Sequence, residues 1–277
     1  MSKRNPEHFW DAGFSVIRQV WKHRELTLTM AKREFLDRYA GQVLGMYWGI
    51  IHPLLILGVF LFLFGIIFKA RIGGTVSVPY GYTIYLFSGM IPWLCFQEVM
   101  NKGALAVTAN ANLVKQVIFP LEVLPIKTVL GSLPGLTVSI GFMTVYALAA
   151  YHFLPWTYVL LPVLVLMEVL FAVGVVFFLA SFGVFFKDTK DLIQFLTFIG
   201  IYLSPIVFLV EWVPNAFRPI IYANPLSHMI WCFQDVCYYG RFQHPISWLV
   251  FFGMTCLVFF LGARTFMRLK THFGNHL

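Results

Sequence analysis

Long apolar runs alternate with short polar segments along most of the chain. A helix needs about 20 apolar residues to cross the hydrocarbon core of a bilayer. Six runs have roughly that length: residues 47–68, 82–99, 128–151, 159–186, 192–210 and 246–263. The pattern predicts an all-α membrane protein with six transmembrane helices, formed by residues 46–277 after a polar N-terminal segment of residues 1–45.

Composition agrees with a membrane protein. Of the 277 residues, 59% are hydrophobic and 12% are charged, and the mean hydropathy is +0.77, well above that of soluble domains. The net charge of +8 does not indicate a nucleic-acid partner, because the basic residues are spread over the N-terminus and certain loops instead of forming one basic surface.

The basic residues predict the orientation of the helices. Sixteen of the 20 Lys and Arg residues lie before the first run, after the second, after the fourth or after the sixth. Loops rich in Lys and Arg stay in the cytoplasm. Both termini, the connection at residues 102–127 and the tail at residues 264–277 are therefore expected on the cytoplasmic side. The first 45 residues lack the apolar core of a cleavable signal peptide.

The segment before the first run is amphipathic. Its apolar residues fall on one helical stripe: Phe14, Ile17, Trp21, Leu28, Ala31, Phe35 and Tyr39. A helix lying in the membrane surface and a helix packed on the cytoplasmic ends of the bundle both fit this pattern. Three glycines follow at a spacing of four, Gly41, Gly45 and Gly49, a spacing that lets a second helix approach closely.

Residues 211–244, after the fifth run, are too apolar for an open loop and too interrupted by proline to span twice. They predict two short re-entrant helices on the outer side, with the turn at Asn224 and Pro225. The aromatic residues fit an interfacial belt or an exit lined for sugar rings: Trp212, Phe217, Tyr222, Trp231, Phe233, Tyr238 and Tyr239.

Enzyme signatures are missing from the sequence. It has no GxxxxGK[ST], HExxH or GxSxG motif and no close pair of cytoplasmic carboxylates, so we expect no catalytic residue, metal site or cofactor in this chain. The four cysteines are expected as buried thiols without a disulfide. Glu168 should face the bundle interior, either in a structural hydrogen bond or in transport. His52, before Pro53, is either a proton relay or a partner of backbone groups that the proline frees.

Four stretches, in this order, resemble the membrane subunit of ABC-2 type exporters, in the branch that exports lipid-linked O-antigen, capsular polysaccharide or teichoic acid. They are RYAGQVLGMYWGIIHPLL from Arg38, FSGMIPWLCFQEVMNKGALAVTANANLVKQVIFPLEVLPI from Phe87, FFKDTKDLIQFLTFIGIYLSPIVF from Phe185 and VPNAFRPIIYANPLSHMI from Val213. Two positions depart from the family: His52 stands where Asn is usual before the proline, and Leu121 stands where a basic residue is common.

The resemblance implies a coupling helix between the second and third runs that docks on a separate ATPase subunit. The matching residues are Asn110, Asn112, Leu113, Lys115, Gln116, Val117, Phe119, Pro120, Leu121, Glu122 and Pro125. The residue types suit a lever, with Leu113, Val117 and Leu121 as the apolar seat and Lys115, Gln116 and Glu122 facing water. The two prolines would fix the chain direction at its ends. An interfacial loop without a partner is the alternative.

The resemblance also implies partners and location. It predicts a homodimer in a bacterial inner membrane, two copies of an ATPase that binds MgATP, and a lipid-linked polysaccharide substrate, with periplasmic export components as further candidate partners. Tyr47, Trp48, Trp93, Phe96 and Tyr202 are candidate channel residues, and Trp212, Phe217, Tyr222, Asn224, Pro225, Trp231 and Tyr238 are candidate residues of an outer gate. The alternatives are an ABC-2 exporter of a small lipid or drug and a membrane-embedded enzyme of glycan assembly.

Overall fold

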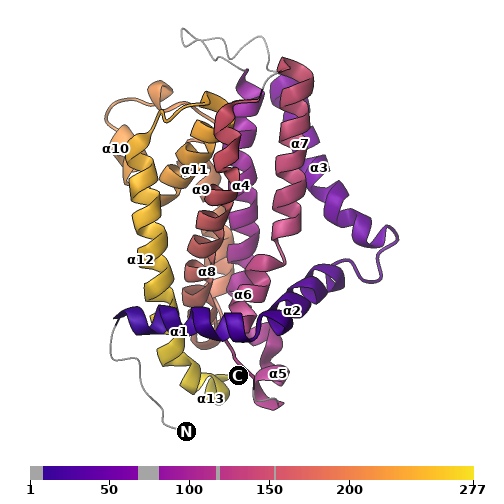
Figure 1. Cartoon of the computed structure of the whole chain (residues 1–277), viewed down its shortest axis with the longest axis vertical. Helices are drawn as coiled ribbons and strands as arrows, with labels where there is room; N and C mark the ends of the chain where they lie inside the picture. The colour runs from indigo at the N-terminus through magenta and orange to yellow at the C-terminus, as the bar shows by residue number, and fades with distance from the viewer. Residues whose placement is uncertain (1–8, 68–80, 117–118, 153) are drawn as a thin grey trace.

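The computed structural model describes residues 9–67, 81–116, 119–152 and 154–277, and within them all regular structure is helical. Long helices run side by side in a bundle, while short helices gather at its two ends (Figure 1). The N-terminal helices, α5 and the C-terminal helix α13 lie at one end, and α10 lies near the other. The predicted all-α class is confirmed for these residues.

The helices of the bundle have the following bounds: α3 Trp48–Phe60, α4 Tyr82–Gly103, α6 Val123–Leu130, α7 Leu133–Tyr151, α8 Leu161–Phe185, α9 Thr189–Leu203 and α12 Pro245–Leu269. The end helices are α1 Phe9–Lys22, α2 Arg24–Asp37, α5 Ala111–Gln116, α10 Arg218–Ala223, α11 Pro225–Gln234 and α13 Phe273–His276. A π-helical turn, η6 (Asp235–Tyr239), continues α11, and a longer one, η2 (Leu61–Ile67), continues α3.

Within the part of the chain that the structure describes, four continuous helical stretches are long and apolar enough to cross a membrane: Gly45–Ile67, Val123–Tyr151, Trp156–Phe185 and Pro245–His272. They correspond to the first, third, fourth and sixth predicted runs. The second run forms α4, which has 22 residues but a lower apolar content because tyrosines, a tryptophan, a proline and amides interrupt it. The fifth run forms α9, which has only 15 residues because Ser204 and Pro205 end it early.

The core of the bundle is the contact between α8 and α12. Gly174 and Gly262 make it possible: a Cβ atom on Gly262 would lie 2.1 Å from the carbonyl oxygen of Gly174, and a Cβ on Gly174 would lie 2.7 Å from the backbone of Phe259. Phe177 and Phe266, both fully buried, pack beside this crossing with their rings 5.0 Å apart. α4 packs against the other side of α8 and also contacts α7, α9 and α11.

The N-terminal segment forms two helices instead of the single predicted helix. The helix is interrupted at His23. α1 packs on α12, whereas α2 packs on α6 and runs in a different direction (Figure 1). Ala12 and Val16 are the buried side of α1, and its opposite apolar side chains Phe14, Ile17 and Trp21 are exposed. α1 therefore packs on the bundle, as one of the two alternatives expects, and also has exposed apolar side chains; its place in the membrane surface stays a prediction.

The predicted role of the glycine triplet is wrong for two of its members. Gly41 and Gly45 have φ of +78° and +48° and no atoms nearby that a Cβ would meet. They lie where the chain turns between α2 and α3, and their positive φ values favour glycine. Gly49 is the one closely approached: a Cβ there would lie 2.6 Å from the ring of Phe35.

Candidate functional sites at the two ends of the bundle

The predicted coupling segment contains a short helix, α5, at the end of the bundle that also carries α1 and α13 (Figure 1). A 3-10 turn at Thr108–Asn110 leads into α5, and Asn112, Lys115 and Gln116 are exposed on it. Leu113, Phe119 and Leu121 are only partly exposed and pack against the core of the chain. Leu113 also lines an open pocket beside α2, so part of the predicted apolar seat is accessible. Val117 lies outside the described residues.

Glu122 does not face water, and that prediction is wrong. Its side chain is 1% exposed and accepts a hydrogen bond from Lys270 Nζ at 2.5 Å. Lys270 directly follows α12, so the ion pair ties the exit of the coupling segment to the C-terminal end of the chain. The α-helix α6 begins at the next residue, with Pro125 in its first turn, where the missing N–H leaves no hydrogen bond unmade.

Two further clusters hold this end of the molecule together. Glu98 Oε1 pairs with Arg38 Nη2 at 2.6 Å and with Lys102 Nζ at 2.7 Å, and it accepts a hydrogen bond from Ser132 Oγ at 2.9 Å. Glu98 lies near the C-terminal end of α4. These contacts join α4 to the chain after α2 and to the start of α7.

The second cluster centres on Lys127. Its Nζ lies 3.1 Å from Glu34 Oε2 on α2 and 3.2 Å from Asn110 Oδ1. Asn110, a predicted coupling residue, thereby connects the segment to α2 through α6. These partners are far apart in sequence, so spacing along the chain gave no signal that they would meet.

The candidate channel residues separate into two groups. Tyr47 and Tyr202 are 71% and 62% exposed, and Trp48 is half-buried. Trp93 and Phe96 are buried, and the prediction that they line a channel is wrong for this conformation. The Trp93 ring covers Gly200 of α9, and Phe96 stacks on Phe171 of α8 at 5.4 Å.

At the outer end, α10 and α11 meet at the predicted turn. The Asn224 side chain caps α11 by accepting from Leu226 N at 3.1 Å, and its amide donates to Ser204 Oγ at 3.2 Å and to the carbonyl of Leu203. The turn therefore lies against the C-terminal end of α9. Four of the candidate gate residues are exposed, namely Trp212, Phe217, Tyr222 and Pro225, whereas Trp231 and Tyr238 are buried.

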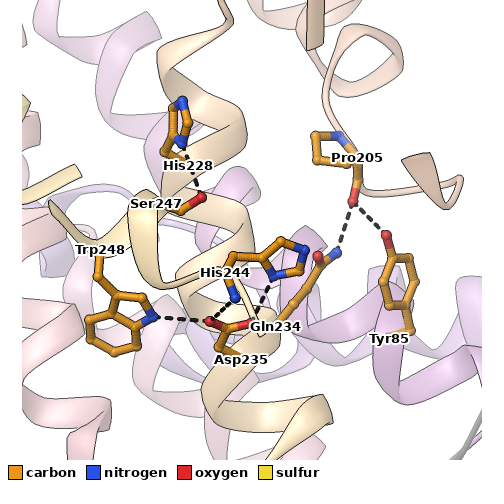
Figure 2. A network of polar contacts seen from close by, with 8 residues as sticks. All are labelled: Tyr85, Pro205, His228, Gln234, Asp235, His244, Ser247 and Trp248. Carbon is orange, nitrogen blue, oxygen red and sulfur yellow. Dashed lines mark hydrogen bonds and ion pairs between the residues drawn. The ribbon is translucent and has the colours of Figure 1, made fainter. Parts of the chain in front are cut away.

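Below this turn lies a polar network that the sequence analysis missed (Figure 2). Asp235, 1% exposed, accepts hydrogen bonds from His244 N at 3.0 Å, His244 Nδ1 at 2.8 Å and Trp248 Nε1 at 3.1 Å. The His244 ring stacks on Trp231. Asp235 thus ties the end of the α11 helix to the first turn of α12. The one available signal was an acidic residue inside an apolar run, which requires partners.

Gln234 and Tyr85 connect the same region to the chain after α9. Gln234 Nε2 donates to the carbonyl of Pro205 at 2.8 Å, and the Tyr85 hydroxyl donates to the same oxygen at 3.1 Å (Figure 2). The two donors satisfy a carbonyl that the break after α9 leaves outside any helix.

Two polar residues of the apolar helices have different surroundings. Glu168 on α8 is buried, as predicted, but neither of its carboxylate oxygens has a hydrogen-bond partner among the described residues, so the predicted structural bond is not present. His52 is exposed and lines a cleft with Glu98, Gln97 and Asn101.

The described residues contain no group of three or more His, Cys, Asp or Glu side chains placed to hold a metal ion. All four cysteines are free thiols, and Cys95, Cys232 and Cys237 are buried.

These features define a multi-pass helical membrane protein whose polar clusters lie near the two ends of an apolar bundle. The chain belongs to the ABC-2 type transporter family, whose model matches residues 25–238. The match extends from α2 to the end of the α11 helix and so includes the coupling segment and the outer hairpin.

Curated relatives extend over almost the whole chain. The chain is 24% identical to the O-antigen export system permease protein RfbA of Myxococcus xanthus, over 95% of its length and 99% of the relative's. It is 28% identical to a protein of the same name from Klebsiella pneumoniae, over 91% and 95% of the two lengths. It is 22% identical to the polysialic acid transport protein KpsM of Escherichia coli, over 83% and 88%. These relatives are transport proteins.

Proposed function

We propose that this chain is the membrane-spanning permease subunit of an ATP-driven exporter for a surface polysaccharide of the O-antigen or capsule type. The observation that carries the proposal is the similarity to O-antigen export permeases along 91–95% of the chain, in a protein whose long helices are apolar enough to span a membrane. The permease performs no chemistry on the glycan. It provides the path, and a partner subunit supplies the energy.

We place the bundle across the inner membrane with six crossings. Besides the four long apolar stretches, α4 and α9 run alongside them in the bundle. The α10 and α11 pair fits a re-entrant hairpin on the outer side, because both helices are too short to span and their turn rests on α9. Both chain ends would then be cytoplasmic, together with the end that carries α1, α5 and α13.

The coupling role of residues 102–127 is supported by the exposed polar side of α5 and by the rigid connections beneath it. Asn112, Lys115 and Gln116 form the outward side. The Glu122–Lys270 and Lys127–Glu34 pairs would pass a push on α5 to α12 and to α2. A separate ATPase that binds MgATP would deliver that push, since the sequence carries no phosphate-binding loop.

A second copy of the chain would complete the path. The exposed apolar side chains of α9 and of the helical stretch Gly45–Ile67, which include Tyr202 and Tyr47, require a cover of lipid or protein. Two copies facing each other would enclose a passage for a lipid-linked glycan, with the outer hairpin at its exit and periplasmic components receiving the product.

Deletion and complementation in the producing bacterium test the proposal. Removal of the chain should abolish surface polysaccharide and leave lipid-linked glycan inside the cell, and the wild-type chain should restore export. Accumulation of an unextended glycan, or absence of the lipid-linked glycan from the cell, would instead indicate an enzyme of glycan assembly. Normal surface polysaccharide with an altered lipid or drug sensitivity would support an exporter of small molecules and contradict the proposal.

A further inference from the structure

An open cleft lies between α4 and α9 at their cytoplasmic ends, apart from the coupling surface and the outer hairpin. Its volume is about 700 Å³, and it is lined by Gln97 and Asn101 of α4 and by Lys190, Asp191, Gln194, Phe195 and Phe198 of α9. Gln97 and Asn101 are four residues apart, as are Lys190 and Gln194, so each pair projects from one side of its helix. None of the candidate channel residues identified from the sequence lines this cleft.

The amide groups of the cleft have unused hydrogen-bonding capacity. The described residues make no hydrogen bond to the side chain of Gln97 or of Gln194. Asn101 contributes less, since its Nδ2 donates to the carbonyl of Gln97 at 2.9 Å and lies 3.4 Å from Thr197 Oγ1, and its Oδ1 is buried from solvent without a partner among the described residues. Each amide carries both donors and acceptors. The cleft thus presents polar groups that suit a ligand with many hydroxyls.

Aromatic rings stand beside these amides. Phe195 and Phe198 are 60% and 64% exposed. The faces of aromatic rings carry partial negative charge, and the C–H faces of pyranose rings are apolar and weakly positive. A sugar has hydroxyls that can hydrogen-bond to amides and C–H faces that can pack on aromatic rings. The cleft provides both kinds of group.

The cleft has no net charge. Lys190 and Asp191 are neighbours and cancel each other, and the α4 side contributes only the neutral Gln97 and Asn101. A polyanionic glycan would need an excess of basic groups to offset its charge. Contact with lipid is a poor alternative, because amides and charges are costly against hydrocarbon.

We propose that this cleft binds uncharged sugar units of the exported glycan as they enter the permease, with Gln97 and Gln194 hydrogen-bonding the hydroxyls and Phe195 and Phe198 packing on the ring faces. This inference rests on the proposed export of a polysaccharide and adds a subsite and a substrate class to it. The cleft would favour neutral glycans over acidic ones such as polysialic acid.

Photo-crosslinking in producing cells tests the cleft directly. The photoreactive amino acid benzoylphenylalanine is placed at residue 194 or 198, and at residue 252 as a control on the exposed side of α12. We expect light-dependent attachment of glycan at 194 and 198 at least about tenfold above that at 252, in line with a specific site. Equal attachment at all three positions, in cells that still export glycan, would overturn the cleft assignment.

Alanine variants give an independent readout. Gln97→Ala with Gln194→Ala should lower glycan export about tenfold, because two or more hydrogen bonds to the substrate are lost, while assembly with the ATPase is unchanged. The matched control is Gln243→Ala, an exposed amide in the loop before α12. Wild-type export by the double variant would contradict the proposal.

The charge preference is tested with two biotin-labelled probes, linear mannohexaose and a hexamer of sialic acid, on the purified complex carrying benzoylphenylalanine at residue 198. Capture of mannohexaose should exceed capture of the sialic acid hexamer at least about tenfold. Preferential capture of the acidic probe, or capture of neither, would overturn the assignment to uncharged units. If deletion of the chain leaves surface glycan unchanged, the proposed function fails, and this inference fails with it.

Discussion

At the scale of single residues, two buried charged side chains form ion pairs with distant parts of the chain, whereas the buried Glu168 has no hydrogen-bond partner among the described residues. Glu122 meets Lys270, and Lys127 meets Glu34. A buried charge whose partner is removed is strongly destabilising, whereas replacement of both members by apolar residues is often neutral. The pairs therefore give the end of the bundle that carries α5 a fixed arrangement, and each can be tested by removing one or both members.

Glu122→Ala should lower the free energy of unfolding by about 1–3 kcal/mol, which is below the roughly 3–5 kcal/mol of a fully buried pair because Lys270 is partly exposed and can reach water. The measurement is the thermal unfolding midpoint of the purified chain. Glu122→Met combined with Lys270→Met should recover most of the loss. An unchanged midpoint in Glu122→Ala would show that the pair contributes nothing to stability.

Asp235→Ala should destabilise the α10–α11 hairpin by about 1–3 kcal/mol, because three hydrogen bonds are lost and the partly buried Trp248 and His244 donors lose their acceptor. Limited proteolysis from the outer side should then cut between α10 and α12 faster than in the wild type. Asp188→Ala, at an exposed aspartate, is the control and should be cut at the wild-type rate. Equal rates in both variants would contradict the anchoring role.

Individual site residues were harder to predict than their segments. Asn224 was expected at a turn, because Asn-Pro has a local signature, and the structure places it there. Glu122 was expected in water because a helical stripe alone cannot show what packs on it, and Lys270 lies 148 positions away. Trp93 and Phe96 were taken as channel residues for the same reason: burial against α8 and α9 depends on tertiary contacts that no local pattern contains.

At the scale of helices, close packing of α8 on α12 determines the shape of the bundle. Without a hydrophobic driving force between helices in lipid, close backbone approach through small residues supplies the attraction. Gly174 and Gly262 provide that approach.

Gly174→Ala should destabilise the chain by about 1–3 kcal/mol, since the new methyl group would meet backbone atoms of α12, which cannot move aside as a side chain can. Gly253→Ala is the matched control on α12, because a Cβ there meets nothing within 4 Å. The control should be neutral or slightly stabilising, by about 0.5–1 kcal/mol from helix propensity. Equal thermal midpoints for the two variants would mean that the helices are not packed as described.

The exposed side of α5 can be tested without disturbing the core. Lys115→Glu reverses a charge on the surface proposed to meet the ATPase, and we expect stimulated ATP hydrolysis and glycan export to fall about tenfold, with an unchanged unfolding midpoint. Lys187→Glu, at an exposed lysine on the loop between α8 and α9, is the control. Wild-type stimulation by Lys115→Glu would remove this side chain from the coupling surface.

Helices were predicted more completely than sites because hydrophobic runs are a local property. The first, third, fourth and sixth runs are long apolar helices in the structure. The interruption of the N-terminal helix at His23 was not predicted, because the apolar stripe continues across it. The interruption depends on tertiary contacts, since α1 and α2 pack against different helices. The glycine triplet was misread for a related reason: sequence spacing does not distinguish a helix contact from the positive φ of Gly41 and Gly45.

At the scale of the whole molecule, the charged pairs and the outer network lie at opposite ends of the bundle, with α12 reaching both. Its first turn holds Trp248, a partner of Asp235, and Lys270, a partner of Glu122, follows its last turn. In the proposed function, a displacement of the coupling segment would therefore reach the α10–α11 hairpin through one continuous helix.

The most direct test of this account is glycan movement in sealed vesicles that contain the purified chain, with and without its ATPase partner. We predict ATP-dependent transfer of lipid-linked glycan only when both proteins are present, and none when the partner's ATP site is inactivated. ATP hydrolysis or glycan transfer by the chain alone would contradict the account.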